Sequence, residues 1–160
     1  MKAPSVAHGT FTVERRYDAS PARVFRAYSE PAAFRRWFVD GEGWTIHEWE
    51  HDFRVGGRAG GRFRLGDKGN ETWFNDTDYL DIAPDQRIVC SYVMGREVDG
   101  QKQRASASLG TTELVADGSG TRLIYTEQGA FFDGADDIRM REQGCAELLD
   151  ALGRELDATR

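Results

Sequence analysis

The sequence predicts an α+β fold in which a curved antiparallel sheet wraps around a long C-terminal helix, with two short helices after the first strand. Residues 44–131 alternate with the period of β-strands and contain short turn signals between the apolar runs. Helical periodicity appears only before and after this region. The chain has 160 residues, the size of one domain, so we expect residues 1–160 to form a single domain.

The N-terminal region predicts one strand followed by two short helices. Phe11 and Val13 alternate with polar residues, as in a strand. Ser20-Pro21 is a helix start, with an N-cap residue followed by proline at the first helical position, and Glu30-Pro31 repeats it ten residues later. Apolar residues recur at helical spacing behind both starts, at Val24, Phe25 and Tyr28 and then at Phe34, Trp37 and Phe38.

The central region predicts six strands joined by tight turns. We place them near residues 44–53, 61–66, 71–82, 87–95, 104–116 and 121–131. The turns contain Gly, Asp and Pro, and every gap is too short for a parallel crossover. The sheet is therefore predicted to be an antiparallel meander.

The C-terminal segment predicts a long amphipathic helix. Asp136 and Asp137 suit its N-terminus. Its apolar stripe consists of Cys145, Leu148, Leu149, Leu152 and Leu156. Gly144 and Gly153 lie inside it, and each costs about 1 kcal/mol of helix propensity relative to alanine. Such an order of elements leaves a void between helix and sheet as the natural ligand site.

Composition and charge argue against several classes of function. The formal net charge of −6 disfavours nucleic acid, which needs a concentrated basic surface. No apolar run approaches the roughly 20 residues of a membrane helix, so no membrane association is expected. Residues 1–10 lack the apolar core of a signal peptide, and Cys90 and Cys145 lie in apolar contexts, so we expect a reducing, cytoplasmic location.

Four segments carry a resemblance to a known family. They are Tyr17–Pro31 with the aromatic residues that follow it, Asp52–Gly57, Tyr79–Val89 and Gly120–Gly129. In this order they resemble the SRPBCC superfamily, also called START-like or Bet v 1-like. The most similar branch is the one named after activator of Hsp90 ATPase homologue 1-like proteins. This resemblance implies the helix-grip fold, in a superfamily that contains ligand carriers and cyclases.

The last helix differs from the pattern of that branch. The branch often has a tryptophan early in this helix and a Gly-Trp pair after it. Here Met140 and Gly144-Cys145 occupy the corresponding positions. The comparison implies additional space at the helix–sheet interface.

Glu127 is the candidate catalytic residue. It follows Leu123 and Tyr125 on one strand face, which is expected to turn inward, where burial would raise the pKa of a carboxyl group. The alternative is a structural ion pair with Arg139 or Arg141. By the same alternation, with Leu80 and Ile82 facing the helix, Asp76 and Asp78 are expected to point inward, and Glu113 shares a face with Leu109 and Thr111.

The predicted ligand-binding set combines these positions with aromatic residues of the sheet and short helices. It consists of Trp37, Trp44, Trp73, Asp78, Tyr92, Tyr125, Glu127, Gly144, Cys145 and Leu148. No cofactor is expected. No metal is expected either, because His47 and His51, although on one strand face, would lie about 13 Å apart.

The leading hypothesis is a protein that binds a small apolar or aromatic molecule between sheet and C-terminal helix. One alternative is a cyclase- or hydrolase-like enzyme that uses an inward carboxylate. Another is an interaction module associated with a chaperone. The sequence also leaves a homodimer open.

Overall fold

The computed structural model describes residues 2–3, 5–40, 44–65 and 71–160, and the side chains of Trp44 and Leu65 lie outside this description. The chain order is β1 (Ala7–Tyr17), α1 (Pro21–Ser29), α2 (Pro31–Phe34), η1 (Arg35–Val39), β2 (Trp44–His51), β3 (Arg58–Leu65), β4 (Thr72–Ala83), β5 (Arg87–Val98), β6 (Gln101–Asp117), β7 (Gly120–Phe131) and α3 (Ile138–Ala158). The predicted sequence of elements is confirmed.

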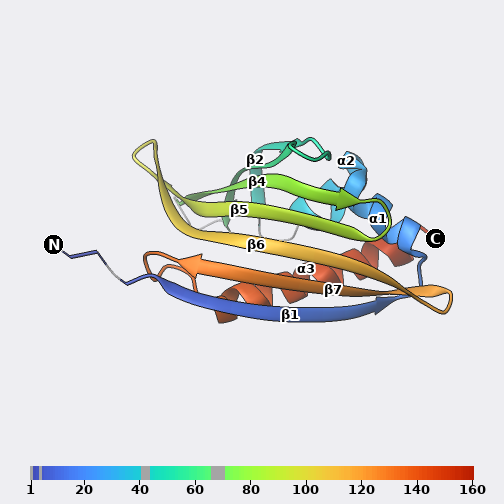
Figure 1. Cartoon of the computed structure of the whole chain (residues 1–160). Coiled ribbons are helices and arrows are strands. Elements are labelled where there is room, and N and C mark those ends of the chain that lie inside the picture. Colours follow the sequence, from blue (N-terminus) through green and yellow to red (C-terminus); the bar gives the residue numbers. More distant parts are fainter. Residues whose placement is uncertain (1, 4, 41–43, 66–70) are drawn as a thin grey trace.

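One seven-stranded antiparallel sheet forms the body of the protein, in the order β1-β7-β6-β5-β4-β3-β2 (Figure 1). Strands β2 to β7 pair with their sequence neighbours, which confirms the predicted meander. Strand β1 pairs with β7 along its whole length, from Ala7 opposite Phe131 to Tyr17 opposite Thr121. Helix α3 covers one face and packs mainly against β1, η1 and α1.

The helix starts follow the signals in the sequence. The Ser20 hydroxyl accepts a hydrogen bond from the Arg23 amide at 3.3 Å, and Pro21 is the first residue of α1. Asp137 Oδ1 accepts a hydrogen bond from the Met140 amide at 2.9 Å and fixes the start of α3. Within the described ranges, no helix is long and apolar enough to cross a membrane.

Tyr17 anchors the C-terminal half of α3 to the sheet. Its hydroxyl donates a hydrogen bond to the Leu149 carbonyl at 2.6 Å. Gly153 lies against the same ring, so close that an added Cβ would sit 3.2 Å from it. The glycine therefore lets the helix backbone approach Tyr17, which places the stripe of Leu149, Leu152 and Leu156 in the core.

A β-bulge in β4 changes which residues face inward. The register of β4 with β5 shifts between Tyr79 and Asp81, where both backbone groups of Tyr79 bond to the turn at Gly56 and Gly57. Tyr79 is buried, whereas Leu80 is 49% exposed. The expectation that Leu80 faces the helix is therefore wrong, because an extra residue reverses the alternation of a strand.

The inward carboxylates predicted from that phase lie on the outer face instead. Asp78 pairs with Arg58 at 3.3 Å, and Asp76 pairs with Lys102 at 3.0 Å. Glu113 is exposed as well, because from Ser106 to Leu114 the buried positions of β6 are the even-numbered ones. Water and surface cations stabilise these carboxylates, so they do not belong to the interior.

A second bulge lies in β2, where the register shifts between Ile46 and Glu48. His47 is the additional residue and is exposed, whereas His51 packs inward on the Phe34 ring at 4.6 Å. The expectation that the two histidines share one face is wrong for this reason. Among the described residues, no group of three or more His, Cys, Asp or Glu side chains could hold a metal ion.

Candidate functional site

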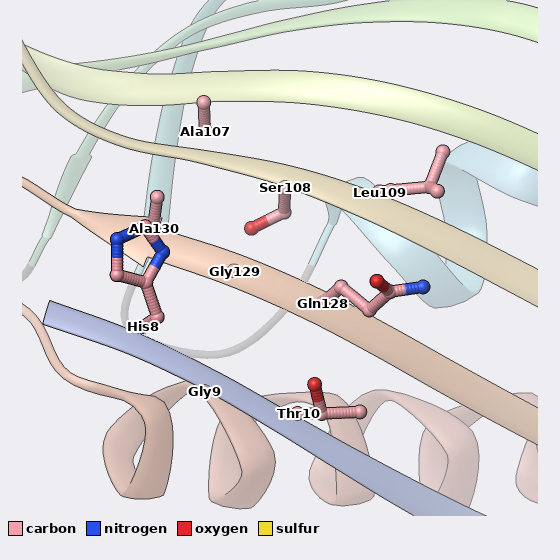
Figure 2. Close-up of a pocket in the computed structure, with 9 residues that line it drawn as sticks. All are labelled: His8, Gly9, Thr10, Ala107, Ser108, Leu109, Gln128, Gly129 and Ala130. Atoms are coloured by element: carbon pink, nitrogen blue, oxygen red, sulfur yellow. The ribbon is translucent and has the colours of Figure 1, made fainter.

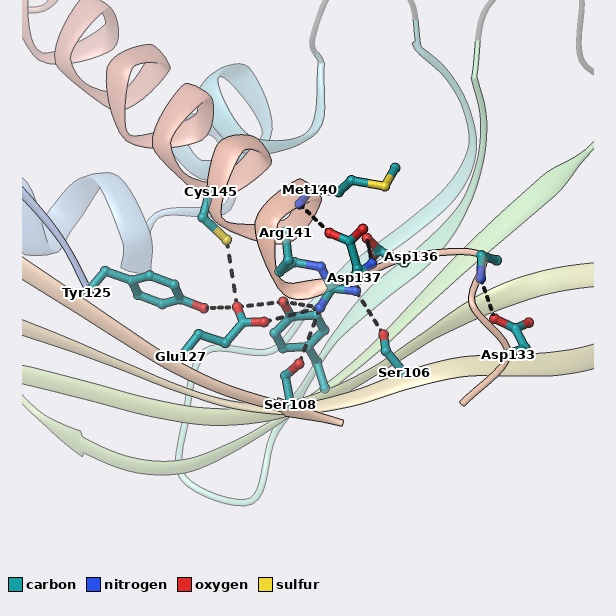
Figure 3. Close-up of polar contacts among 12 residues, drawn as sticks. Ser106, Ser108, Tyr125, Glu127, Asp133, Asp136, Asp137, Met140, Arg141 and Cys145 are labelled. Atoms are coloured by element: carbon teal, nitrogen blue, oxygen red, sulfur yellow. Dashed lines mark hydrogen bonds and ion pairs between the residues drawn. The ribbon is translucent and has the colours of Figure 1, made fainter. Parts of the chain in front are cut away.

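A cluster of polar side chains lies between the middle of the sheet and the first turns of α3, centred on Glu127 (Figure 3). Leu123 and Glu127 are both completely buried, so the strand phase predicted for β7 is correct. The hydroxyls of Tyr92 and Tyr125 each donate a hydrogen bond to Glu127 Oε1 at 2.7 Å. Hydroxyl donors from two strands, β5 and β7, thus converge on one carboxylate oxygen.

Arg141 provides the opposite charge from α3. Its Nη1 lies 3.2 Å from Glu127 Oε2, and its side chain is 7% exposed. The same guanidinium also donates to the oxygens of Tyr92, Ser106, Ser108 and Asp136, at distances of 2.7 to 3.2 Å. Of the two arginines that the sequence offered as partners, the structure selects Arg141, whereas Arg139 is exposed. The docking of α3 on the sheet sets this choice, because it turns Arg141 inward and Arg139 outward.

Burial is the largest influence on the pKa values of the two tyrosines. It raises the pKa of both Tyr92 and Tyr125 well above the usual value for tyrosine, and the nearby Glu127 adds to this rise. Burial alone would lower the pKa of Arg141, but its interactions with Tyr92, Glu127 and Asp136 raise it above its usual range. At neutral pH the tyrosines are therefore neutral hydrogen-bond donors and Arg141 is a cation.

The two cysteines are thiols, not nucleophiles. Cys145 Sγ lies 3.7 Å from Glu127 Oε1, and burial raises its pKa, with a further rise from the Glu127 charge. Burial likewise raises the pKa of Cys90 to about 12. Reactive cysteines have lowered pKa values, so this chemistry differs from that of a catalytic thiolate.

One face of α3 borders open space. A Cβ added to Gly144 would meet no atom within 4 Å. Leu148, one turn later on this face, is half-buried, and Ala151 and Glu155 continue the face at helical spacing. Ala151 and Glu155 line a pocket of about 520 Å³ between α3 and η1, which the Trp37 ring also borders. The unfilled position at Gly144 and this pocket therefore lie along the same side of the helix.

The remaining predicted site residues have different surroundings. Trp37 is a buried core residue whose Nε1 donates to the Ala27 carbonyl at 2.8 Å, and it also lines the pocket between α3 and η1. Trp73 is half-buried beneath Arg96, whose guanidinium carbon lies 5.8 Å from the ring centre. Trp44 belongs to β2, and its side chain is outside the described structure.

The structure thus brings together Tyr92, Tyr125, Glu127 and Cys145, and places Gly144 and Leu148 beside them on α3. It separates Asp78 from this group, on the outer face. Met140, the other position where the helix departs from its family pattern, is 59% exposed and adds no space at the interface.

Sequence reasoning missed two serines and one aspartate of the cluster. Ser106 and Ser108 occupy alternate buried positions of β6, on a face that continues with Gly110, Thr112 and Leu114. Small polar residues at alternate positions of a strand with a buried face were a usable signal for a buried polar partner. Asp136 was identified only as a helix-terminus residue, and its bond to Arg141 requires the fold.

Another pocket lies on the face of the sheet that points away from α3. It is a shallow hollow of about 370 Å³ over β1, β7 and β6 (Figure 2). Its lining includes the exposed residues His8, Thr10 and Gln128, together with Gly9 and Gly129. The alternation of β7 separates it from the Glu127 cluster, which lies on the opposite face.

Together, the seven-stranded sheet, the long helix across its inner face and the short helices after β1 define a helix-grip protein of the SRPBCC superfamily. The family model described as "Activator of Hsp90 ATPase homolog 1-like protein" matches residues 18–157. The chain belongs to this family. A search among curated proteins found no match.

Solved structures agree with this assignment. A crystal structure of a protein from Rhizobium loti is 50% identical, with a TM-score of 0.83, and the alignment covers 95% of this chain and 99% of that one. A protein from Rhizobium leguminosarum is 37% identical, with a TM-score of 0.87 and coverages of 96% and 97%. An AHSA1-like protein from Aeromonas hydrophila, 17% identical with a TM-score of 0.65 and coverages of 94% and 93%, shares the fold.

Proposed function

We propose that this protein binds a small, largely apolar molecule between α3 and the inner face of the sheet. The observation that carries the proposal is the unfilled side of α3, where a side chain added at Gly144 would meet no atom within 4 Å. Gly144 is half-buried on the helix that covers the inner face of the sheet. Members of this superfamily commonly bind ligands between that helix and the sheet, which supports the proposal.

The side chains around this position suit an apolar ligand with one polar group. Leu148, Cys145 and Tyr125 are half-buried although they belong to the inner faces of their elements. A ligand that covered them would gain hydrophobic free energy in proportion to the apolar area removed from water. The Glu127 cluster would meet the polar group of the ligand, and its internal hydrogen bonds hold it in place beforehand.

The same cluster supports binding better than acid–base catalysis. Glu127 is held by a cation and by two hydroxyl donors, and the tyrosines have pKa values far above neutrality. A general acid or base works best when its pKa lies near the operating pH. We therefore propose a carrier or sensor of a small molecule.

The test is titration with a neutral apolar fluorophore such as Nile red. We expect saturable binding with a stoichiometry of one, and its loss in Gly144→Trp, in which the indole occupies the open space. Met140→Trp is the matched control, because it adds the same side chain to the same helix on its exposed side. Both variants are first checked for a native circular dichroism spectrum. Undiminished binding by folded Gly144→Trp, or no binding by the native protein, would overturn the proposal.

A further inference from the structure

We infer that the pocket between α3 and η1 is a second site, which binds a small organic anion whose carboxylate pairs with Arg154. The pocket is separate from the site proposed above, because Gly144 precedes the first pocket residue of α3, Ala151, by about 10 Å along the helix. Its volume of about 520 Å³ lies within the usual range of ligand sites, roughly 300 to 1,000 Å³.

One wall of the pocket is a face of α3. It consists of residues at the spacing of one helix face, Ala151, Arg154, Glu155 and Ala158. Alanine has no side chain beyond Cβ, so the two alanines leave room beside the longer side chains. This wall therefore combines a small apolar surface with one cation and one carboxylate.

The opposite wall comes from η1 and the residue after it, with Arg36, Trp37 and Asp40. The η1 segment is a π-helical turn, closed by a hydrogen bond from the Asp40 amide to the Arg35 carbonyl at 2.8 Å. Such turns are rare and frequently lie at functional sites. Trp37 is fixed in the core, where its Nε1 already donates to the Ala27 carbonyl, so its ring offers the pocket an apolar surface.

The two carboxylates at the pocket already have cations of their own. Glu155 Oε1 accepts from Arg36 Nε at 2.8 Å and lies 2.6 Å from Arg36 Nη2. Asp40 lies 3.3 Å from Arg35 Nε. Neither carboxylate therefore presents an uncompensated negative charge to a ligand.

Arg154 is the cation that remains. Among the described residues its guanidinium has no hydrogen bond, ion pair or ring contact. Arg36 uses Nε and Nη2 for Glu155, and within the described ranges its Nη1 donates to no acceptor. N–H groups of two arginines are thus available at the pocket, and guanidinium groups bind carboxylates by charge-assisted hydrogen bonds.

The two parts of the lining define the class of ligand. A carboxylate satisfies Arg154, which a neutral molecule would leave without a partner. An apolar body covers Trp37 and the alanines and gains hydrophobic free energy in proportion to the apolar area removed from water, which an inorganic anion would not. The ligand is therefore a carboxylate on a small apolar or aromatic body.

The experiment is isothermal titration of the native protein at pH 7.5 with two probes of one shape. 2-Naphthoate is an anion, and 2-naphthamide is its neutral counterpart. A carboxylate paired with a partly exposed arginine corresponds to about 3- to 10-fold in affinity, so we expect naphthoate to bind more tightly than naphthamide by this factor. No binding of naphthoate, or equal affinities of the two probes, would overturn the inference.

Arg154→Gln should abolish the preference for naphthoate. Arg139→Gln is the matched control, because it removes an exposed arginine of the same helix that does not line the pocket, and it should keep the preference. Ala151→Trp should abolish the binding of naphthoate, because the indole occupies the pocket. Arg154 is exposed, so its variant decides even if Ala151→Trp loses the native circular dichroism spectrum. A preference that survives Arg154→Gln, or undiminished binding by folded Ala151→Trp, would refute the site.

Gly144→Trp distinguishes this site from the one proposed above, and it should keep the preference for naphthoate. Loss of that preference in folded Gly144→Trp would place naphthoate at the other site and overturn the inference. Binding of Nile red decides the proposed function separately. Absence of Nile red binding, together with naphthoate binding that depends on Arg154, would refute the proposed function and leave this inference standing.

Discussion

Glu127 and Arg141 form an ion pair in the protein interior, joining β7 to the first turns of α3. Glu127 is 0% exposed and Arg141 is 7% exposed. Buried ion pairs are weak contributors to net stability, but removal of one partner leaves the other charged and uncompensated. The pair therefore fixes where α3 lies on the sheet, and with it the position of the Gly144 side of the helix.

Glu127→Gln should destabilise the protein by about 1.5–3 kcal/mol, because the neutral amide accepts more weakly from Tyr92, Tyr125 and Arg141, although Asp136 still pairs with Arg141. The measurement is the free energy of unfolding in urea. Glu113→Gln removes an exposed carboxylate of the neighbouring strand and should change it by less than about 0.5 kcal/mol. Unchanged stability of Glu127→Gln would contradict the structural role of this carboxylate.

Substitution by alanine should stabilise the protein at Gly144 more than at Gly153. The Cβ added in Gly144→Ala would meet no atom within 4 Å, so this variant should gain about 1 kcal/mol of stability from helix propensity. Gly153→Ala places its Cβ 3.2 Å from the Tyr17 ring, so a local shift offsets the same gain. Thermal unfolding of the two variants gives the comparison. A larger gain for Gly153→Ala would mean that Tyr17 does not pack closely on α3.

His51 should make stability depend on pH. Burial lowers the pKa of His51 below 6.5, outweighing the opposite effect of Asp52, and neither ring nitrogen has a hydrogen-bond partner among the described residues. Above about pH 6.5 the imidazole is neutral in both the folded and the unfolded state, so it does not lower the free energy of unfolding. As the pH falls below this value, the unfolded chain takes up the proton more readily than the folded one, so stability decreases until the folded pKa is passed.

The measurement for His51 is the free energy of unfolding of the native protein and of His51→Phe at several values from pH 5 to pH 8. The difference between the two free energies of unfolding reports the effect of the imidazole, because the other titrating groups are common to both proteins. Phenylalanine keeps the stacking on Phe34. His47→Phe, at an exposed position, is the control. A constant difference across this range would show that His51 is not buried in its neutral form.

Both cysteines should be unreactive in the folded protein. Burial raises the pKa of Cys145 and raises that of Cys90 to about 12, so almost no thiolate is present at pH 8. With a disulfide reagent such as Ellman's, we expect labelling of two thiols only after unfolding in urea. Rapid labelling of one thiol in the native protein would identify a low-pKa cysteine and contradict the environment described for it.

Much of the fold was predictable because its signals are local. Ser20-Pro21 and Asp137 start helices through contacts within one turn, and the short turns of residues 44–131 permit only antiparallel neighbours. The inward position of Glu127 was predictable for the same reason, since unbroken alternation from Leu123 determines it.

The errors came from bulges. The additional residues at His47 and Leu80 reverse the alternation of β2 and β4. Because of the bulge in β4, Asp78 lies on the outer face, although an inward carboxylate was predicted there. The β4 bulge arises where Tyr79 bonds to the turn at Gly56 and Gly57, which is more than twenty residues away in the chain. The alternation of residues within one strand does not predict a contact with such a distant turn.

The sequence by itself determined the order of elements, the antiparallel sheet, the inner face of β7 and the two arginines available to Glu127. Only the tertiary structure decided that Arg141 is the partner, that Tyr92 and Tyr125 share one oxygen of Glu127, and that Gly144 borders open space whereas Gly153 packs on Tyr17. The physical reason is that caps and alternation depend on neighbours within a few residues. The hydrogen-bond partners of a buried carboxylate depend on how a helix docks on a sheet, and that is set by packing across the whole domain.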